Sequence, residues 1–80
     1  MKLKINLKDI VGIEKFYKMV LPFESDLDVS IDSYTVDGHS LMGLISLNVG
    51  RDLTLTIHEK ADGEALKIRE LMKDNGFLVE

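Results

Sequence analysis

The sequence predicts an α+β domain in which three helices cover one face of a four-stranded antiparallel sheet. Alternating apolar and polar residues are typical of strands with one exposed face. Such segments lie at 2–8, 26–33 and 52–58, with a short strand expected at 34–36. Apolar residues at helical spacing lie at 10–21, in a short run after Ser40, and at 63–75. The expected order is strand, helix, strand, strand, helix, strand, helix, within a single domain over 1–80.

The composition excludes several classes of function. A net charge of −4 and a pI of about 5.1 argue against direct nucleic-acid binding. The absence of cysteine excludes a disulfide scaffold and a thiolate metal site, and we expect no metal and no other cofactor. No apolar run is long enough for a membrane span, and polar residues interrupt any signal-peptide core near the start. We expect a cytoplasmic protein. Open sheet edges would allow a strand-exchanged dimer, but no feature of the sequence selects one.

The first long helix is expected to begin after Asp9, a suitable N-cap, and to end before Pro22. Its apolar stripe is expected to comprise Ile10, Ile13, Phe16 or Tyr17, Val20 and Leu21.

The last helix has Asp62 as its candidate N-cap and the pair Asn75–Gly76 as its stop signal. Phe77 is expected to fold back over its final turn. The buried side is expected to comprise Ala65, Ile68, Leu71 and Met72.

The short central helix is expected to start at Ser40, whose hydroxyl can cap it. Gly43 lies inside this helix, where glycine costs roughly 1 kcal/mol relative to alanine. Such a cost suggests a close approach of another segment or of a partner. The helix is expected to end at Asn48 to Gly50, with Gly50 in a left-handed conformation.

The words Ser-Leu-Met-Gly-Leu-Ile-Ser-Leu over 40–47 resemble the second-helix signature of HPr, the phosphocarrier of the bacterial sugar phosphotransferase system. The resemblance continues through strand 53–57 and the triplet Glu-Ala-Leu at 64–66. It implies an HPr-like open-faced β-sandwich. In HPr proteins the equivalent helix displays an apolar docking patch, which here falls on Leu41, Met42 and Ile45. In many relatives the serine that begins this helix is phosphorylated by HPr kinase, which implies phosphorylation of Ser40.

Each of these implications has a simpler alternative. N-capping alone accounts for Ser40. Leu44 competes with its neighbours for the core face, so either Met42 alone protrudes or several residues form a contiguous patch.

The resemblance does not extend to the segment that holds the phosphoryl-accepting histidine in HPr. HPr needs a histidine at the start of the first helix, typically in Gly-(Leu/Ile)-His-Ala-Arg-Pro. The equivalent region here is Val11, Gly12, Ile13 and Glu14, which contains no histidine, arginine or proline. A carboxylate at Glu14 would repel a phosphoryl group. We therefore expect no catalytic residue and loss of transfer from enzyme I to a sugar transporter.

His39 and His58 are the only substitutes for the missing acceptor, and both are expected to be ordinary surface residues. Histidine can accept and pass on a phosphoryl group, so a carrier with His39 as an unconventional acceptor is one alternative.

The leading expectation is a non-catalytic, regulatory HPr-like protein that acts through contacts at its second helix. Its partners would be proteins, such as HPr kinase, a transcriptional regulator or phosphotransferase-system components. An unphosphorylated adaptor module is the other alternative. The sequence holds no nucleophile–base pair, phosphate-binding glycine loop or metal-ligand spacing, so an independent enzyme is not expected.

Overall fold

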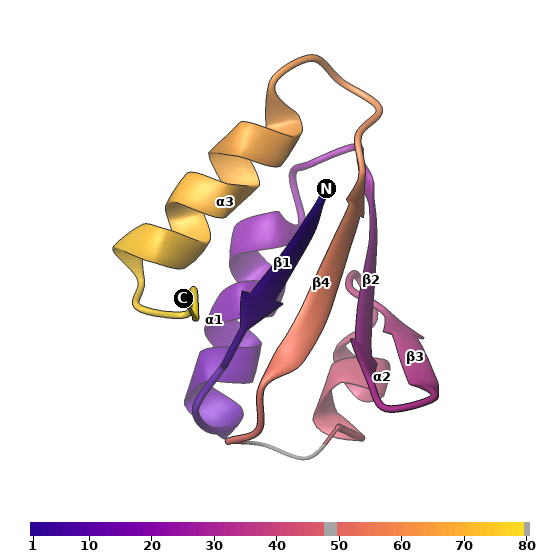
Figure 1. Cartoon of the computed structure of the whole chain (residues 1–80), viewed down its shortest axis with the longest axis vertical. Coiled ribbons are helices and arrows are strands. Elements are labelled where there is room, and N and C mark those ends of the chain that lie inside the picture. The colour runs from indigo at the N-terminus through magenta and orange to yellow at the C-terminus, as the bar shows by residue number, and fades with distance from the viewer. Residues whose placement is uncertain (48–49, 80) are drawn as a thin grey trace.

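The computed structural model describes residues 1–47 and 50–79. Its elements follow the predicted order and confirm the predicted α+β class (Figure 1). They are β1 (Lys2–Ile5), α1 (Ile10–Val20), β2 (Asp26–Ile31), β3 (Tyr34–Asp37), α2 (Leu41–Ile45), β4 (Leu53–His58) and α3 (Glu64–Asp74). None of the described helices is both long enough and apolar enough to span a membrane.

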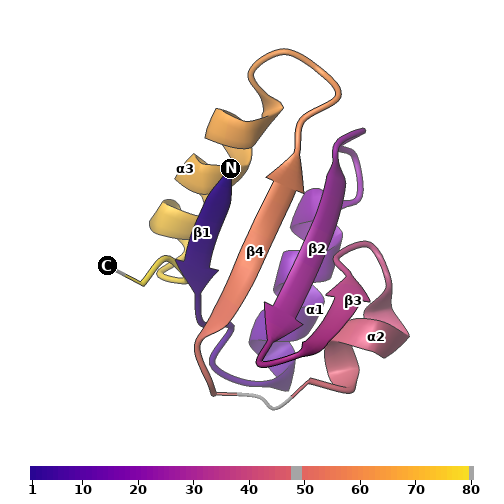
Figure 2. The same ribbon diagram turned by 45° about the vertical axis from the view of Figure 1, so that its right-hand side comes forward.

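The four strands form one antiparallel sheet in the order β1-β4-β2-β3. The register places Leu3 and Val29 on either side of Leu55. Figure 2 shows the helices behind the strands, so that one face of the sheet is left uncovered. The alternation in the sequence explains this layering, because each strand turns its apolar side chains toward the helices.

A single apolar core fills the space between the sheet and the helices. Its completely buried members come from both layers and include Ile5, Phe16, Val20, Val29, Leu44, Leu55, Ile68 and Met72. Ala65 is also buried, as predicted for α3, whereas Leu71 is only half-buried.

The stripe predicted for α1 is only partly correct. Ile13, Phe16 and Val20 are buried, whereas Ile10 and Leu21 are exposed. These two residues lie at opposite ends of the helix. Asp9 caps α1 as predicted, since its carboxylate accepts a hydrogen bond from the Gly12 N–H at 2.9 Å.

The first strand is shorter than the segment predicted at 2–8. After Ile5 the chain leaves β4, and the Asn6 N–H donates to the Phe77 carbonyl at 2.8 Å. Lys8 then adopts a left-handed φ of 74°, and the Asp9 N–H donates to the Leu7 carbonyl across it. This one-residue turn redirects the chain into α1.

The N-cap predicted for the last helix is wrong. Gly63, with φ 83°, occupies the cap position of α3 and makes no side-chain hydrogen bond. The carboxylate of Glu59 instead accepts from the Ala65 N–H at 2.9 Å. A group from six residues upstream therefore takes the role assigned to Asp62.

The end of α3 agrees with the prediction. Gly76 has a left-handed φ of 74°, and the Phe77 N–H donates to the Met72 carbonyl at 2.8 Å. Phe77 is buried, and Leu78 forms an isolated antiparallel bridge with Ile5. The C-terminal segment thus lies along the outer edge of β1.

Candidate functional site

The turn that leads into α2 is built by Asp37 and Gly38. The Asp37 carboxylate accepts from the His39 N–H at 2.8 Å, and its carbonyl accepts from the Ser40 N–H at 3.0 Å. Gly38 donates to the Leu27 carbonyl at 2.7 Å, and a Cβ at Gly38 would lie 2.7 Å from the Leu27 Cβ. The close approach to β2 explains why this position is glycine.

Ser40 caps α2 as predicted. Its backbone is extended, with φ −104° and ψ 108°, and its Oγ accepts a hydrogen bond from the Gly43 N–H at 3.2 Å. Its side chain is partly accessible rather than buried. The hydroxyl therefore lies at the positive, N-terminal end of a short helix, in a residue that is only partly buried.

Gly43 is explained by a close approach within the chain, which was one of the two predicted reasons. A Cβ on Gly43 would lie 3.1 Å from the Cβ of Val36 on β3 and 3.3 Å from the Ser40 Oγ. The small residue lets α2 pack closely against β3, and this contact within the chain is enough to explain the glycine.

The residues predicted for the docking patch separate into two groups. Leu44 takes the core position and is completely buried. Met42 is 80% exposed and Ile45 43% exposed, whereas Leu41 is half-buried. Met42 and Ile45 are three residues apart and therefore share one side of the helix. Met42 is therefore not the one exposed apolar residue of α2, since Ile45 is exposed beside it. Leu41 adds less exposed apolar surface than these two residues.

Tyr34 adds an aromatic side chain that the sequence reasoning did not assign to this site. It is 52% exposed, and its hydroxyl lies 3.1 Å from the Ser46 Oγ. Because Ser46 donates its own proton to the Gly43 carbonyl at 2.6 Å, Tyr34 is the donor in the first bond. The chain of bonds joins β3 to the end of α2. The sequence placed Tyr34 at the start of a predicted strand, but no pattern in it indicated a contact with the helix that follows Ser40.

The predicted end of α2 needs correction. The helix ends at Ile45 with Ser46 as its C-cap, and the Ser46 N–H bonds back to the carbonyls of Met42 and Gly43. The Leu47 N–H makes one further bond to the helix, to the Leu44 carbonyl at 3.1 Å. Gly50 does have the predicted left-handed φ, at 83°, but it lies beyond the helix end. Asn48 and Val49, also assigned to the end, lie outside the described residues.

His39 joins the turn to the end of α1. Its Nε2 lies 3.0 Å from the Val20 carbonyl, which can only accept, so Nε2 carries a proton. Its Nδ1 lies 3.9 Å from the Asp37 carboxylate, and the side chain is 26% exposed. His39 is therefore a partly covered bridge between helices rather than a freely exposed loop residue.

His58, the other histidine, lies at the end of β4, where its Nε2 is 3.0 Å from the Asp28 carboxylate on β2. Both side chains are substantially exposed. The predicted surface position of His58 is confirmed.

The start of α1, where the HPr resemblance would place the phosphoryl acceptor, presents Val11 and Glu14 to solvent and buries Gly12 and Ile13. Gly12 is needed for packing, because a Cβ there would lie 1.7 Å from the Leu7 carbonyl oxygen.

The chain shares its fold with a crystal structure of HPr-C-His from Thermoanaerobacter tengcongensis. The TM-score is 0.72, with 22% sequence identity, and the match covers 91% of this chain and 91% of that chain. Neither the models of known protein families nor the curated protein sequences give a match. The architecture is thus an HPr-like α+β fold.

Proposed function

We propose that this protein is a divergent, non-catalytic HPr-like regulator that binds other proteins through α2, under the control of phosphorylation at Ser40. It would belong with the phosphotransferase system as a contact partner rather than as a carrier. The observation that carries the proposal is the adjacency, on an HPr-like fold, of a partly buried capping serine and two exposed apolar side chains. Ser40 begins the helix that displays Met42 and Ile45.

The docking surface fits a protein partner by its chemistry. Exposed apolar side chains at the centre of a contact exclude water, and methionine adapts its shape to a partner surface. Tyr34 lies beside the C-terminal end of the helix and offers an aromatic contact of the kind enriched at interfaces. Partner contact at α2 would therefore centre on Met42 and Ile45, with Leu41 and Tyr34 beside them.

Phosphorylation at Ser40 would change the charge of this surface without changing its shape. A phosphoserine carries nearly two negative charges at neutral pH, and its oxygens can take over the hydrogen bond from the Gly43 N–H. The Asp37 carboxylate at the preceding turn opposes the added charge. A partner that carries basic residues around an apolar pocket would gain affinity, and an acidic partner would lose it.

The primary test is intact-mass spectrometry after two parallel reactions. One contains phosphoenolpyruvate and enzyme I, and the other contains ATP and HPr kinase. We expect a gain of one phosphate with the kinase only, and no gain in the Ser40→Ala variant. Equal labelling of Ser40→Ala would refute the site.

The docking surface is tested by substitution with a matched control. Met42→Glu should reduce binding to HPr kinase or another captured partner by at least about tenfold, because a charge enters an apolar contact. Leu66→Glu changes an exposed leucine on α3 in the same way and should leave this binding unchanged. Equal losses in both variants would argue against α2 as the contact.

The cap role of Ser40 must be separated from its modification. Ser40→Ala should lower the free energy of unfolding by about 1 kcal/mol, whereas Ser40→Asp keeps a capping oxygen and should retain it. Thermal unfolding of both variants therefore shows whether a functional loss in Ser40→Ala reflects phosphorylation or a weakened helix.

A second candidate is a phosphocarrier that uses His39, and the tautomer of this residue favours it. Because Nε2 donates to Val20, the neutral ring keeps a lone pair on Nδ1. The Asp37 carboxylate 3.9 Å from Nδ1 opposes an incoming phosphoryl group. An acid-labile phosphate acquired from enzyme I, and lost in His39→Gln, would establish this alternative over the first.

A further inference from the structure

The two edges of the sheet differ in how their backbone groups are satisfied. Along β1, the segment after α3 supplies partners. The Asn6 N–H donates to the Phe77 carbonyl, and the Val79 N–H donates to the Lys4 carbonyl, both at 2.8 Å. β3 forms the opposite edge, beside α2 (Figure 2). Among the described residues, no segment pairs with the outer side of β3.

The register shows which backbone groups of β3 point away from β2. The Gly38 N–H bonds to the Leu27 carbonyl, and hydrogen-bonded pairs recur at every second residue of an antiparallel ladder. Thr35 and Asp37 lie between these pairs, so they turn their N–H and C=O groups outward. The Asp37 carbonyl already accepts from the Ser40 N–H. The Asp37 N–H and both backbone groups of Thr35 thus face the open edge.

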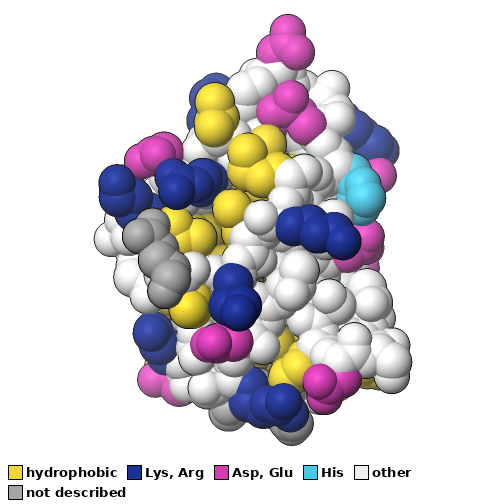
Figure 3. Space-filling view, viewed as in Figure 1, with side chains coloured by type: hydrophobic (Ala, Val, Ile, Leu, Met, Phe, Trp, Pro, Cys, Tyr) yellow, Lys and Arg dark blue, Asp and Glu magenta, His cyan; other side chains and the backbone are white. Residues whose placement is uncertain are grey.

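The uncovered face beside this edge is acidic. In the space-filling view, hydrophobic side chains gather near α3, whereas polar and charged side chains cover most of β4 and β2 (Figure 3). The register forms one row across this face from Lys2, Thr56, Asp28 and Asp37. The row ends in two directly opposed carboxylates, and like charges in this position are unfavourable. His58 lies 3.0 Å from Asp28 and His39 lies 3.9 Å from Asp37, but these histidines are charged only when protonated.

The helix side of the same edge is apolar. Gly43 of α2 approaches Val36 of β3, and the next residue, Leu44, is completely buried. Met42 is about 200° from Leu44 around the helix, so its exposed side chain points away from the core and past the edge of the sheet. Tyr34 is exposed beside the same helix. A strand added to β3 would therefore meet Met42 and Tyr34 on its helix side.

We propose that the outer edge of β3 binds an extended segment of a partner protein, in which basic and apolar residues alternate, as an added antiparallel strand. The backbone of this segment bonds to Thr35 and Asp37. Because side chains alternate between the two faces of a strand, the basic residues lie beside Asp37 and the apolar residues lie over Met42 and Tyr34. The inference deepens the proposed function and rests on it only for the role of Met42 in partner binding.

The charges argue against a second copy of this chain as the occupant. If β3 paired with β3 of another copy about Thr35, Asp37 of each copy would lie beside the Asp32–Ser33 turn of the other. This pairing would gather acidic groups from two chains that each carry a net charge of −4. A basic segment instead places a positive charge opposite Asp37.

The test uses a synthetic peptide, Lys-Val-Lys-Val-Lys-Val-Lys, blocked at both ends. Because the edge offers only a few backbone groups, we expect a dissociation constant between about 10 µM and about 1 mM. Titration of the full chain, followed by NMR, should shift the amide signals of β3 most strongly. Hydrogen exchange at the Thr35 N–H should become slower in the complex. Absence of binding up to about 1 mM overturns the proposal.

Methylation of the peptide backbone provides a matched control. Residues opposite Thr35 and Asp37 in an antiparallel pair share their face and turn their backbone groups toward β3, and these residues are the lysines. Methylation of the lysine amide nitrogens should weaken binding at least about tenfold, because it removes donors and adds bulk at the contact. Methylation of the valine nitrogens should change binding by less than about twofold. Equal effects of the two overturn the proposal, because a contact made by charge alone does not distinguish them.

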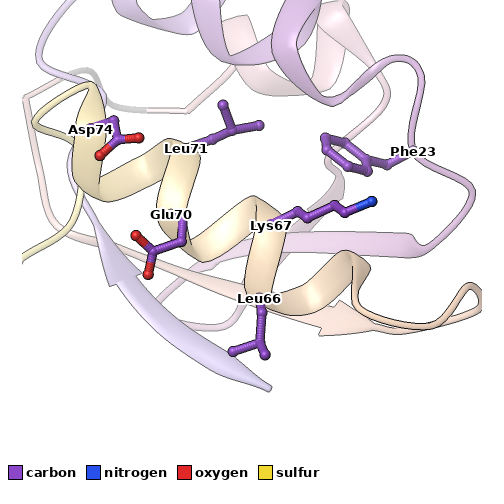
Figure 4. A pocket seen from close by; sticks show the side chains of 6 residues that line it. All are labelled: Phe23, Leu66, Lys67, Glu70, Leu71 and Asp74. Atoms are coloured by element: carbon purple, nitrogen blue, oxygen red, sulfur yellow. The ribbon is translucent and has the colours of Figure 1, made fainter.

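Substitutions in the protein test the two faces of the edge. Asp37→Asn removes the charge but keeps an oxygen that can accept from the His39 N–H, and it should weaken peptide binding at least about threefold. Asp62→Asn, at an exposed position before α3, should not. Met42→Ala should also weaken binding, whereas Leu66→Ala changes a side chain that projects from α3 and should not (Figure 4).

The outcomes separate this inference from the proposed function. Peptide binding at β3 without labelling of Ser40 by HPr kinase would leave the edge site standing and refute the phosphorylation. Labelling of Ser40, together with a peptide that does not bind to β3, would refute the edge site alone. Loss of binding in Met42→Ala with no difference between the methylated peptides would show that partners contact α2 without adding a strand.

Discussion

The buried hydroxyl of Ser25 donates a 2.6 Å hydrogen bond to the carboxylate of Glu64, the first residue of α3. The same carboxylate accepts from the backbone N–H of Ser25 at 2.9 Å and of Glu24 at 3.2 Å. The Ser25 Oγ in turn accepts from the Lys60 N–H at 3.0 Å. Four bonds thus tie the segment after α1 and the segment after β4 to the start of α3.

Ser25→Ala should therefore destabilise the fold. The change removes a donor from a carboxylate and an acceptor from the Lys60 N–H, and unsatisfied buried polar groups cost about 1–3 kcal/mol each. Urea unfolding measures the loss. Ser33→Ala, at an exposed turn position, is the control and should stay within about 0.5 kcal/mol of wild type. Similar stability of both variants would show that the buried bonds contribute nothing.

The stability of the protein should depend on pH through Glu64. The hydrogen bond from the Ser25 hydroxyl lowers the Glu64 pKa below its ordinary value of 4.5, and backbone N–H groups and the charge of Lys67 add to this against the effect of burial. A carboxyl with a lowered pKa stabilises the fold above its unfolded pKa, and this contribution is lost as the pH falls through the folded value.

The comparison of wild type with Glu64→Gln isolates this effect from the other carboxylates. The difference in unfolding free energy between the two should be constant above about pH 5 and should shrink as the pH falls below about 4.5. Urea titrations at several pH values measure it. A difference that is independent of pH would mean that the ionised form of Glu64 has no special role.

Two glycines inside helices should respond very differently to alanine. Gly12→Ala places a Cβ 1.7 Å from the Leu7 carbonyl oxygen, a backbone atom, so it should cost about 3 kcal/mol or more. Gly43→Ala brings a Cβ to 3.1 Å from the Val36 side chain while gaining helix propensity, so it should change stability by no more than about 1 kcal/mol. Thermal unfolding of both variants tests the ranking, and equal effects would contradict the packing described for α1.

In the part of the chain that the structure describes, two non-glycine residues adopt left-handed backbone conformations, Lys8 with φ 74° and Asp32 with φ 53°. Lys8→Gly should raise the free energy of unfolding by up to about 1 kcal/mol, because glycine enters this region without a steric penalty. Asp32→Gly should gain less, since aspartate tolerates the conformation better than lysine. Chemical denaturation compares them. A loss of stability in Lys8→Gly would show that the turn is not strained.

Local patterns were sufficient to predict the fold class and the order of elements. The alternation of Leu53, Leu55 and Ile57 predicts β4, and Asp9 and Gly76 mark a helix start and a helix end. These signals act over a few residues and do not require knowledge of the rest of the chain.

The features that the sequence did not reveal depend on distant contacts. Ser25 and Glu64 lie 39 residues apart, and no periodicity connects them. Glu59 replaces Asp62 as the cap of α3 because the connecting segment folds back on the helix. The exposure of Ile10 and Leu21, at the two ends of α1, likewise depends on how the layers assemble.

At the site, the sequence identified Ser40 as a cap and Met42 as exposed. It did not identify Tyr34, whose role depends on the pairing of β3 beside α2, nor the bridge from His39 to Val20. Whether Ser40 is phosphorylated is a question of recognition by another protein, which the fold of this chain does not encode by itself.

The pairing of β1 also sets the order in which the molecule can assemble. Among the described residues, β1 bonds with β4 and with the segment after α3, both more than forty residues away along the chain, whereas β2 and β3 form a local hairpin. Contacts between residues far apart in the sequence cost more loop-closure entropy than those of a hairpin, so we expect them to form after the nearer contacts. We therefore expect β1 to join the sheet late, although it precedes the other strands in the sequence. The hairpin and β4 would provide the template on which both ends of the chain finally close.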